Sequence, residues 1–565
     1  MISFFENAIF RWQGSGGTME APLVRGMAYV TAKYQNLTPK IKTIHAITKV
    51  NGRSANGARL GGDKFTFEMN NGQTWKLYTS THVTIHFQTS QITFEGRFSG
   101  SLRLAIVPDH AAAALLDQHS RKIPKGGSIS AQSSSGGKSA TYKFNFKTEG
   151  SGNLLMLALP HHQQTLSQAL RNEFKLDTIK GKMVGVVGET WSLTEKLSSI
   201  AWNAPRSIPA DKKEIIRNAL KGDIHQRVTA KDTYFSGKQM SLIGRLALIA
   251  DELGETGLAQ TYRTNLKRYM EPYLRTNNGK LVYDRSWGGV VDTAGINDKG
   301  ANFGFGYYND HHFHLGYFVY AAACIAKADQ GWANQYQNAI MALIRDYANP
   351  ALGSGDPHFP FMRNKDWFDG HSWAAGLFEF GDSRNQESTS EAVNAWYAIA
   401  LYGLATGNNR LKDLGRLAMA TELRTTHLYW QIDSSDGIYP SPYTNNKVVG
   451  ILWGTKVDYA TFFGGNTEYI HGIQYLPFTP ITEELLEKKW IQEEYPIVRT
   501  AIQSAKVGWK GFIYMAHAVI DPAAAWQEIQ TLYGYDDGNT KTNTLYWVAT
   551  RPGLGGIANS TNGFC

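Results

Sequence analysis

The hydrophobic pattern of the chain changes period once, and this change separates two kinds of structure. From about residue 22 to 160, apolar and polar residues alternate in short runs, as in residues 64–69 and 84–89. A period of two is typical of half-buried strands. Asn-Gly, Gly-Gly and Ser-Gly pairs interrupt the runs, which favours an antiparallel β-sandwich. Within this region, the Ser/Gly-rich stretch 126–139 predicts a mobile loop.

Beyond residue 215 the period becomes helical and stays so. Before it, residues 156–215 mix strand-like and helical pieces and end in a connector that contains Pro205 and Pro209. The clearest helices are expected at 215–220, 239–253, 257–274, 311–328, 332–347, 388–405, 410–430, 483–490, 495–505 and 522–533. With weaker segments the number approaches a dozen, which favours helix pairs arranged in a ring, an (α/α)6 toroid. No repeat of fixed period favours a solenoid instead.

A chain of 565 residues is too long for one ordinary hydrophobic core. We therefore predict a multidomain protein with an antiparallel β-sandwich over residues 1–155, a small α/β linker domain over 156–215 and an (α/α)6 toroid over 216–565.

The charge balance excludes some partners. Lysine and arginine exceed aspartate and glutamate by 57 − 48 = 9, but no lysine-arginine block of the kind that follows a phosphate backbone is present. Nucleic acid is therefore not an expected partner. The diffuse charge could suit an acidic polymer, although an ordinary solvated surface accounts for it better. No window reaches the roughly 18 to 20 apolar residues of a membrane span, so no membrane partner is expected either.

The two cysteines give little information about the compartment. Cys324 lies in an apolar helical run and Cys565 is the last residue, so a disulfide is not expected. The start of the chain lacks the basic and apolar regions of a signal peptide, so either it carries no export signal or it begins downstream of one. Sequons at Asn36 and Asn559 would be used only in a secreted protein.

Aromatic residues make up 12% of the chain, and several lie in polar loops. Loop aromatics beside Asp, Asn and Gly present flat apolar faces to sugar rings, while polar neighbours bind the hydroxyl groups. For any single residue, a role in packing under the loop is the more frequent alternative. The residues in question are Trp287, Trp367, Trp373, Trp453, Tyr307 and Tyr308.

A first dense cluster, residues 307–317 (Tyr-Tyr-Asn-Asp-His-His-Phe-His-Leu-Gly-Tyr), enters a helix. Asp310 stands where an N-cap would be, and capping is one account of it. A second account is a carboxyl group kept protonated by aromatic surroundings so that it can act as an acid. His311, His312 and His314 lack the spacing and the further ligands of a zinc site, so no metal and no cofactor is expected.

A second cluster covers residues 366–378 and 384–397. Ser388 and Glu391 fit a capping box, in which the Glu391 carboxylate would bond back to the Ser388 backbone N–H. Glu387 lies at or just before the helix start, at the rim of the bundle. Glycoside hydrolysis needs two carboxyl groups on opposite sides of the scissile bond. Whether Asp310 and Glu387 converge is left open by sequence alone, because 77 positions separate them (387 − 310).

These stretches resemble glycoside hydrolase family 81, the endo-β-1,3-glucanases. The resemblance rests on motifs in the same order, and it covers the chain from about Ala21 to the segment after Asn543. The motifs begin at Pro22 (Pro-Leu-Val-Arg-Gly-Met-Ala-Tyr), Tyr283 (Tyr-Asp-Arg-Ser-Trp-Gly-Gly), Asp310 (Asp-His-His-Phe-His-Leu-Gly-Tyr), Asp369 (Asp-Gly-His-Ser-Trp-Ala-Ala-Gly), Asn385 (Asn-Gln-Glu-Ser-Thr-Ser-Glu-Ala) and Tyr469 (Tyr-Ile-His-Gly-Ile-Gln-Tyr-Leu-Pro).

The resemblance implies a sandwich, a linker and a catalytic (α/α)6 domain that cleaves β-1,3-glucan with inversion of the anomeric centre. It assigns Asp310 as general acid, Glu387 as general base and Glu391 as a second active-site glutamate. It also implies sugar contacts at Asp284, Trp287, His314, Asp369, His371 and Trp373. Family members begin with strands before the Pro22 segment, so the sandwich is expected to lack its first strands.

Two other classes of function remain open at this stage. A polysaccharide lyase would use Tyr and His against an acidic sugar, and the net positive charge would suit such a substrate. A non-catalytic β-glucan-binding protein would use the carboxylates as caps and hydrogen-bond acceptors. We expect a monomer whose partner is the polysaccharide, secreted or cell-wall associated, with a cytoplasmic location as the alternative.

Overall fold

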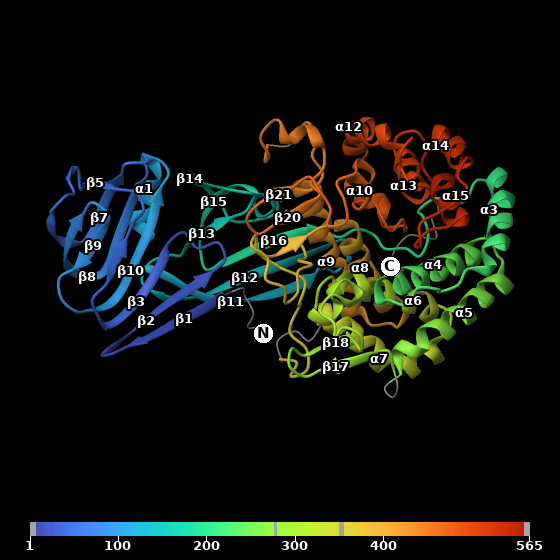
Figure 1. Ribbon diagram of the computed structural model, residues 1–565, viewed down its shortest axis with the longest axis horizontal. Coiled ribbons are helices and arrows are strands. Elements are labelled where there is room, and N and C mark those ends of the chain that lie inside the picture. The colour runs from blue at the N-terminus through green and yellow to red at the C-terminus, as the bar shows by residue number, and fades with distance from the viewer. Residues whose placement is uncertain (1–6, 276–278, 350–354, 436, 559–565) are drawn as a thin grey trace. The chain divides into compact units, whose positions relative to one another are not determined.

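The computed structural model of the protein describes residues 7–275, 279–349, 355–435 and 437–558. Backbone contacts divide the chain into two compact units. The first comprises Met1–Gln132 and Thr141–Thr194, and the second comprises Ser133–Ala140 and Glu195–Cys565. The first unit is built mainly of antiparallel strands and the second mainly of helices (Figure 1). The coarse expectation of a strand region followed by a helical region is therefore confirmed. The division into three domains stays a prediction.

A ten-stranded antiparallel sheet forms most of the first unit. Its order is β1 (Asn7–Gly14), β2 (Gly17–Val24), β3 (Val30–Leu37), β10 (Phe98–Val107), β8 (Thr74–Gln88), β7 (Arg59–Met69), β5 (Ile47–Val50) and β6 (Arg53–Ser54), and β4 (Lys40–Lys42) pairs with β9 (Gln91–Phe94) beside β8. The apolar side of the alternating pattern forms the core, where Phe65, Leu77, Ile85 and Phe87 are fully buried. A strand, β1, does precede the strand that contains Pro22.

Two smaller sheets and a helix complete the strand-rich region. They are β13 (Leu155–Ala158), β15 (Gly181–Val187) and β14 (Leu170–Thr178); β11 (Lys122–Ser133), β12 (Ser139–Gly150) and β16 (Thr190–Lys196); and the helices α1 (His110–His119) and α2 (Pro160–Gln163).

The expectation of a mobile loop over residues 126–139 is wrong, because most of this stretch lies in strand β11 and the turn to β12. Residues 126–129 are buried in the sheet, and the Ser134 backbone N–H donates to the Ser139 carbonyl (2.9 Å) to close the hairpin. Small side chains here permit close packing of a strand, although their composition is typical of a loop.

The second unit contains the helices α3 (Ala210–Gly222), α4 (Thr233–Glu252), α5 (Thr256–Leu274), α6 (His311–Ala326), α7 (Gln330–Ala348), α8 (Thr389–Ala405), α9 (Asn409–Tyr429), α10 (Thr467–Gly472), α11 (Thr482–Leu485), α12 (Lys488–Val498), α13 (Val507–His517), α14 (Pro522–Ile529) and α15 (Lys541–Ala549). Short 3-10 turns η1 (Asp223–His225), η2 (Ala301–Tyr307), η3 (Tyr443–Asn446) and η4 (Arg499–Ala501) and the strands β17 (Leu281–Asp284), β18 (Gly289–Asp292), β19 (Asn385–Gln386), β20 (Ile451–Trp453) and β21 (Val457–Asp458) lie in the connections.

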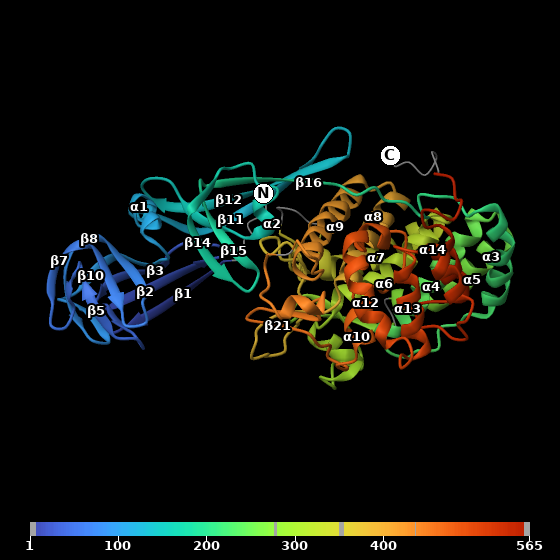
Figure 2. The ribbon, with the colours of Figure 1, turned by 90° about the horizontal axis from the view of Figure 1, so that it is seen from above.

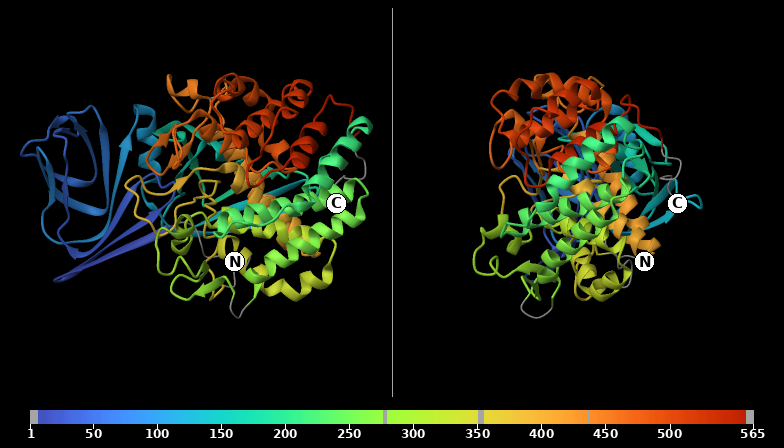
Figure 3. Two further views of the ribbon diagram at one scale, coloured as in Figure 1. Left: turned by 45° about the vertical axis from the view of Figure 1, so that its right-hand side comes forward. Right: turned by 90° about the vertical axis from the view of Figure 1, so that its right-hand side faces the viewer.

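Consecutive helices differ in burial. Every residue of α6 is buried, as are nearly all of α4 and α8, whereas α5 and α7 bury only one face and α9 is buried all round only in its middle part, residues 415–423. A helix that is apolar all round belongs to the interior, and a helix with one apolar face belongs to the outside. The inner helix α6 packs against α4 and α8, and each outer helix packs on its inner neighbour (Figures 2 and 3). Helix α15 packs against α3 and α4.

The C-terminal helices differ from the sequence prediction. The segment 483–490 contains two helices, α11 and α12, and α12 continues through Pro496 instead of beginning at Tyr495. Its buried residues Trp490, Ile491, Glu494, Tyr495 and Val498 form one continuous stripe, and this packing outweighs the helix-breaking tendency of proline. The predicted helix ranges do not include α1, α10, α13 or α15.

Within the described residues, no helix combines the length and apolarity needed to cross a bilayer. Cys324 is fully buried in α6 and carries a free thiol. Asn36 lies exposed at the end of β3, and its side-chain amide donates to the Gly16 carbonyl (2.6 Å). Cys565 and Asn559 lie outside the described residues.

Candidate active site

A cavity of about 660 Å³ opens in the helical unit at the start of α6 and α8. Three of the carboxylates singled out in the sequence, Asp310, Glu387 and Glu391, line it together. The remaining lining residues are Tyr234, Phe235, Lys238, Gly300, Phe303, Gly304, Asn309, Phe313, His314, Phe378, Phe380, Phe462, Phe463, Ile473, Leu476, Trp509 and Asp536. The fold therefore brings Asp310 and Glu387 to one site.

Asp310 is the N-cap residue of α6 by position, but its side chain makes no capping hydrogen bond. The cap is made by the backbone instead, because the Asp310 carbonyl accepts from the N–H groups of Phe313 (2.9 Å) and His314 (3.1 Å). The residue has a left-handed backbone, with φ of 58°. Such a conformation is uncommon for a residue with a side chain and is typical of functional sites. Simple N-capping therefore does not account for this aspartate.

The preceding segment has the same unusual backbone. Asn302, Phe303 and Tyr308 also have positive φ, at 49°, 60° and 65°. Gly304, at 84°, allows the turn to approach Phe378, since a Cβ atom at this position would lie 2.5 Å from that ring. Asp310 is fixed at the end of this segment by its backbone N–H, which donates to the Ala374 carbonyl (2.8 Å).

The environment of Asp310 favours its protonated form. Burial raises the pKa of its carboxyl well above the ordinary value, and the neighbouring negative charges of Glu387 and Glu391 raise it further. Both effects disfavour the ionised group. Asp310 can therefore carry a proton under conditions in which an exposed aspartate has lost it.

Glu387 lies between strand β19 and helix α8. Its Oε1 accepts from the backbone N–H of Phe462 (2.8 Å), and its backbone carbonyl accepts from the Gln474 side chain (2.5 Å). Burial raises the pKa of this carboxyl to about 7, against the effect of the Phe462 N–H and with a further contribution from Glu391. A glutamate with a pKa near neutrality is suited to accept a proton from water.

Glu391 lies in the first turn of α8 and is 4% exposed. Only half of the predicted capping box forms, because the Ser388 hydroxyl accepts from the Glu391 backbone N–H (3.4 Å) but the Glu391 carboxylate is directed elsewhere. Its Oε1 accepts hydrogen bonds from the hydroxyl groups of Tyr234 and Tyr317, each at 2.6 Å. The capping interpretation of the Glu391 side chain is therefore wrong.

A buried cation, which sequence reasoning missed, lies beside this glutamate. Lys238, in the apolar helix α4, is 3% exposed and pairs with Asp536 (Nζ to Oδ2, 2.9 Å). Burial alone would lower the pKa of the ammonium group, but Asp536 and Glu391 outweigh this effect and raise it. Lys238 is therefore charged. The sequence signal for it is a lysine inside a helical run in which most residues are apolar.

The aromatic lining differs from the residues chosen in the sequence. Phe303, Phe462 and Phe463 are half exposed at the cavity, and the Phe463 ring stacks on Trp509 with centroids 5.9 Å apart. None of the six loop tryptophans and tyrosines singled out above belongs to the lining. Phe462 and Phe463 precede a Gly-Gly pair in a polar segment, which is the signal that could have identified them.

Among the predicted sugar contacts, His314 reaches the cavity. Its Nδ1 lies 2.8 Å from the Thr233 hydroxyl and its ring stacks on Phe305, with centroids 4.9 Å apart. Asp284 and Trp287 do not line the cavity. Asp284 accepts from the Tyr308 hydroxyl (2.8 Å), and Trp287 is 57% exposed.

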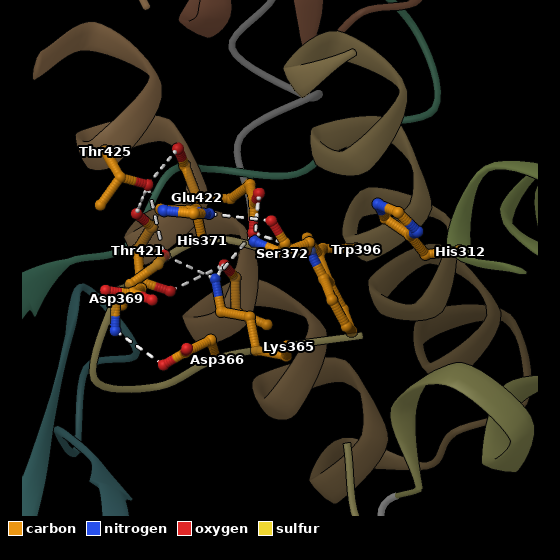
Figure 4. Close-up of polar contacts among 12 residues, drawn as sticks. His312, Lys365, Asp366, Asp369, His371, Ser372, Trp396, Thr421, Glu422 and Thr425 are labelled. Atoms are coloured by element: carbon orange, nitrogen blue, oxygen red, sulfur yellow. Dashed lines mark hydrogen bonds and ion pairs between the residues drawn. The ribbon is translucent and has the colours of Figure 1, made fainter. Parts of the chain in front are cut away.

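Asp369, His371 and Trp373 are likewise outside the cavity lining, and their side chains are at most 4% exposed. The Trp373 indole N–H donates to Asp369 (3.2 Å), and His371 Nδ1 lies 2.8 Å from the Ser372 carbonyl. Asp369 and His371 lie in a buried polar network around the ion pair of Lys365 with Glu422 (2.8 Å) (Figure 4). The Trp373 indole N–H also donates to Asp366 (3.1 Å). The structure gives these three residues packing roles, and sugar contact stays a prediction for them, as it does for Asp284 and Trp287.

The histidines of the first cluster do not converge. His311 pairs with Asp346, and its Nε2 lies 2.7 Å from the Phe305 carbonyl, whereas His312 Nε2 faces Gln386 (3.2 Å). Within the described part of the chain, no group of three or more His, Cys, Asp or Glu side chains could hold a metal ion.

Comparison with known proteins gives one consistent family. Residues 1–205 match the glycosyl hydrolase family 81 N-terminal domain, and residues 207–548 match its C-terminal domain. A glucan endo-1,3-beta-D-glucosidase of Glycine max is 36% identical over 553 residues, covering 94% of this chain and 80% of that protein. Glucan endo-1,3-beta-D-glucosidase 2 of Saccharomyces cerevisiae is 30% identical over 549 residues, covering 89% and 68%.

A solved structure agrees with these matches. A mutant of the glycoside hydrolase family 81 protein from Clostridium thermocellum superposes with a TM-score of 0.87 at 26% identity, covering 97% of this chain and 77% of that chain. Two family models that together span almost the whole chain, relatives at 30% identity or more and a shared fold lead to one conclusion. The chain belongs to glycoside hydrolase family 81.

Proposed function

We propose that this protein is an endo-acting β-1,3-glucanase that hydrolyses its substrate with inversion of the anomeric configuration. The observation that carries the proposal is the convergence of Asp310, Glu387 and Glu391 on one aromatic-lined cavity, with Asp310 and Glu387 both shifted toward higher pKa. The names of the relatives supply the substrate, β-1,3-glucan.

In the proposed reaction Asp310 is the general acid. Its proton passes to the glycosidic oxygen as the bond from that oxygen to the anomeric carbon breaks. Glu387, as the general base, takes a proton from a water molecule whose oxygen forms the new bond to the anomeric carbon from the opposite face. After one turnover Asp310 is ionised and Glu387 is protonated, and solvent exchange restores both groups. This division requires the two carboxyl groups to stand roughly 6.5 to 9.5 Å apart.

The walls of the cavity fit a sugar chain. Phe303, Phe462 and Phe463 expose apolar ring faces, which can stack on pyranose rings, while Asn309 and His314 offer polar atoms beside Asp310. The aromatic surroundings also exclude water around the carboxyl groups, which strengthens every charge interaction in the site.

We propose two finer features of the fold. The helices form an (α/α)6 toroid with α4, α6, α8, α10, α13 and α15 inside and α5, α7, α9, α12, α14 and α3 outside. The packing of α15 on α4 and α3 supports ring closure. The N-terminal strands form a β-sandwich. The pairing of the long strand β8 supports this proposal, because β8 pairs with β10 in its first half, with β9 in its second half and with β7 in both halves.

We also propose a monomer that acts outside the cell or at a cell wall on polymeric glucan. Release of oligosaccharides from laminarin tests the function directly. New reducing ends and ultraviolet absorbance are measured in the same reaction. New reducing ends without ultraviolet absorbance support a hydrolase. An absorbing unsaturated product would indicate a lyase, and binding without any product would indicate a glucan-binding protein.

A further inference from the structure

The carboxylate of Glu391 is surrounded by donors and by one cation. Tyr234 reaches it from α4, Tyr317 reaches it from α6, and both tyrosine hydroxyls donate to the same oxygen, Oε1. Lys238, also of α4, lines the same cavity as Glu391. An oxygen that accepts two hydrogen bonds of 2.6 Å is suited to an ionised carboxylate, which has only acceptor positions. Glu391 is 4% exposed, so this charge has little contact with solvent.

Buried charge of this kind needs a counter-charge. Lys238 supplies it. Burial raises the pKa of the Glu391 carboxyl above its ordinary value, and the positive charge of Lys238 is the largest opposing effect, ahead of the hydrogen bonds from Tyr234 and Tyr317. The lysine is itself held by Asp536 at 2.9 Å, and the absence of a side chain at Gly538 makes room for it, because a Cβ atom there would lie 2.9 Å from Lys238 Cε.

The charge of Glu391 in turn acts on Asp310. Together with Glu387 it raises the pKa of the Asp310 carboxyl, which the proposed reaction requires in its protonated form. The other titratable groups around Glu391 are His314 of α6 and, beyond Lys238, Asp536 and Asp537 before α15. Burial holds the pKa of His314 well below its ordinary value, so this imidazole carries no competing positive charge.

We propose that Lys238 is a positioning residue of the active site: through its pairing with Asp536 and its place beside Glu391 it keeps Glu391 ionised, and Glu391 keeps the proton on Asp310. Lys238 acts through Glu391 and takes no part in proton transfer to the substrate. The inference rests on the proposed function, because it assigns the protonated Asp310 the role of acid.

The test is the pH dependence of kcat/KM on laminarin oligosaccharides for Lys238→Met. Without the lysine, Glu391 takes up a proton in the working range and Asp310 loses a repelling charge. The alkaline limb, which reports loss of the Asp310 proton, should then move to lower pH by about one pH unit. A shift of this size corresponds to the loss of a charge interaction of about 1.4 kcal/mol at Asp310. Lys267→Met is the matched control. Lys267 of α5 pairs with Asp329, the N-cap residue of α7, and neither residue lines the cavity, so the alkaline limb of this variant should not move.

A double-mutant cycle decides whether the effect passes through Glu391. In a Glu391→Gln background, Lys238→Met should change kcat/KM by less than about twofold and should not move the limb. Since Lys238→Met leaves Asp536 unpaired, the variant Lys238→Met/Asp536→Asn, which removes both charges, serves if the single variant misfolds.

An unmoved alkaline limb in a folded Lys238 variant would overturn the inference. An equal shift of the limb with and without the Glu391→Gln substitution would overturn it as well, because the effect would then not pass through Glu391. Wild-type protein is assayed first. If it releases no oligosaccharide, the proposed function fails and the inference falls with it. If it cleaves normally while the Lys238 variants keep its pH profile, only the inference fails.

Discussion

The backbone N–H of Phe462 donates a 2.8 Å hydrogen bond to Oε1 of Glu387. A segment 75 positions further along the chain thus orients the carboxylate that we assign as general base. The bond favours the ionised form of Glu387, whereas burial and Glu391 favour the protonated form. The balance of these effects leads to a first prediction about pH.

Activity should fall on the acid side with a midpoint near pH 7. Glu387 must be ionised to accept a proton from water, and its pKa is raised to about 7. The rate should therefore rise as pH increases through this value, and it should fall again at higher pH as Asp310 loses its proton. The profile of kcat/KM measures both limbs. An acid limb centred below about pH 5, near the ordinary glutamate value, would contradict the assignment of this pKa to the base.

Azide should rescue Glu387→Ala but not Glu391→Ala. A small anion can occupy the space of the attacking water and needs no base, so the Glu387 variant should form an α-glycosyl azide. Glu391 is committed to Tyr234, Tyr317 and the charge balance of Asp310, and azide does not replace those interactions. Rates with and without azide, with product identification by mass spectrometry, check this expectation. Rescue confined to the Glu391 variant would reverse the two roles.

Asp310→Asn should lose activity while keeping its fold and its affinity for glucan. Asparagine cannot donate the proton, and loss of a general acid reduces the rate by roughly 10²- to 10⁴-fold. Folding should not suffer, because the Asp310 side chain makes no capping bond and asparagine is an equally good N-cap. Turnover is compared with glucan binding by calorimetry. Near-normal turnover in this variant would leave Asp310 without a catalytic role.

Glu387→Gln should raise thermal stability above about pH 7 and leave it unchanged near pH 4. The folded-state pKa is raised to about 7, so the folded protein holds this proton more tightly than the unfolded chain does. The associated stability is present below the unfolded-state value near 4.5 and is lost as pH rises through 7, above which the ionised group costs on the order of 3 kcal/mol. Unfolding temperatures are compared with those of Glu379→Gln, which changes an exposed glutamate. Equal stability of wild type and Glu387→Gln at pH 8 would contradict a raised pKa of Glu387 in the folded protein.

The change of hydrophobic period near residue 215 was sufficient to predict strands before it and helices after it, because burial of one strand face or one helix stripe leaves a direct trace in the sequence. The same reasoning failed at residues 126–139, where small side chains serve a strand, and at α12, where packing outweighs Pro496. In both places tertiary contacts override local preference.

Sequence motifs identified Asp310, Glu387 and Glu391, but they could not separate residues that face the cavity from residues that support it. Asp369, His371 and Trp373 share a motif, and all three are buried in the network around Lys365. Conversely, Lys238 and Asp536 reach the cavity from segments far apart in sequence, and no local pattern joins them. Side-chain direction within a motif and contacts between distant segments require the folded structure.

We propose that Asp310 and Glu387 hydrolyse β-1,3-glucan by a single inverting displacement. Proton NMR of the anomeric signals during the first minutes of laminarin digestion tests it most directly, because it detects both cleavage and the configuration of the new reducing end before mutarotation. With Asp310 as acid and Glu387 as base, the α anomer should appear first and the β anomer should appear later through mutarotation. A first product in the β configuration would contradict it.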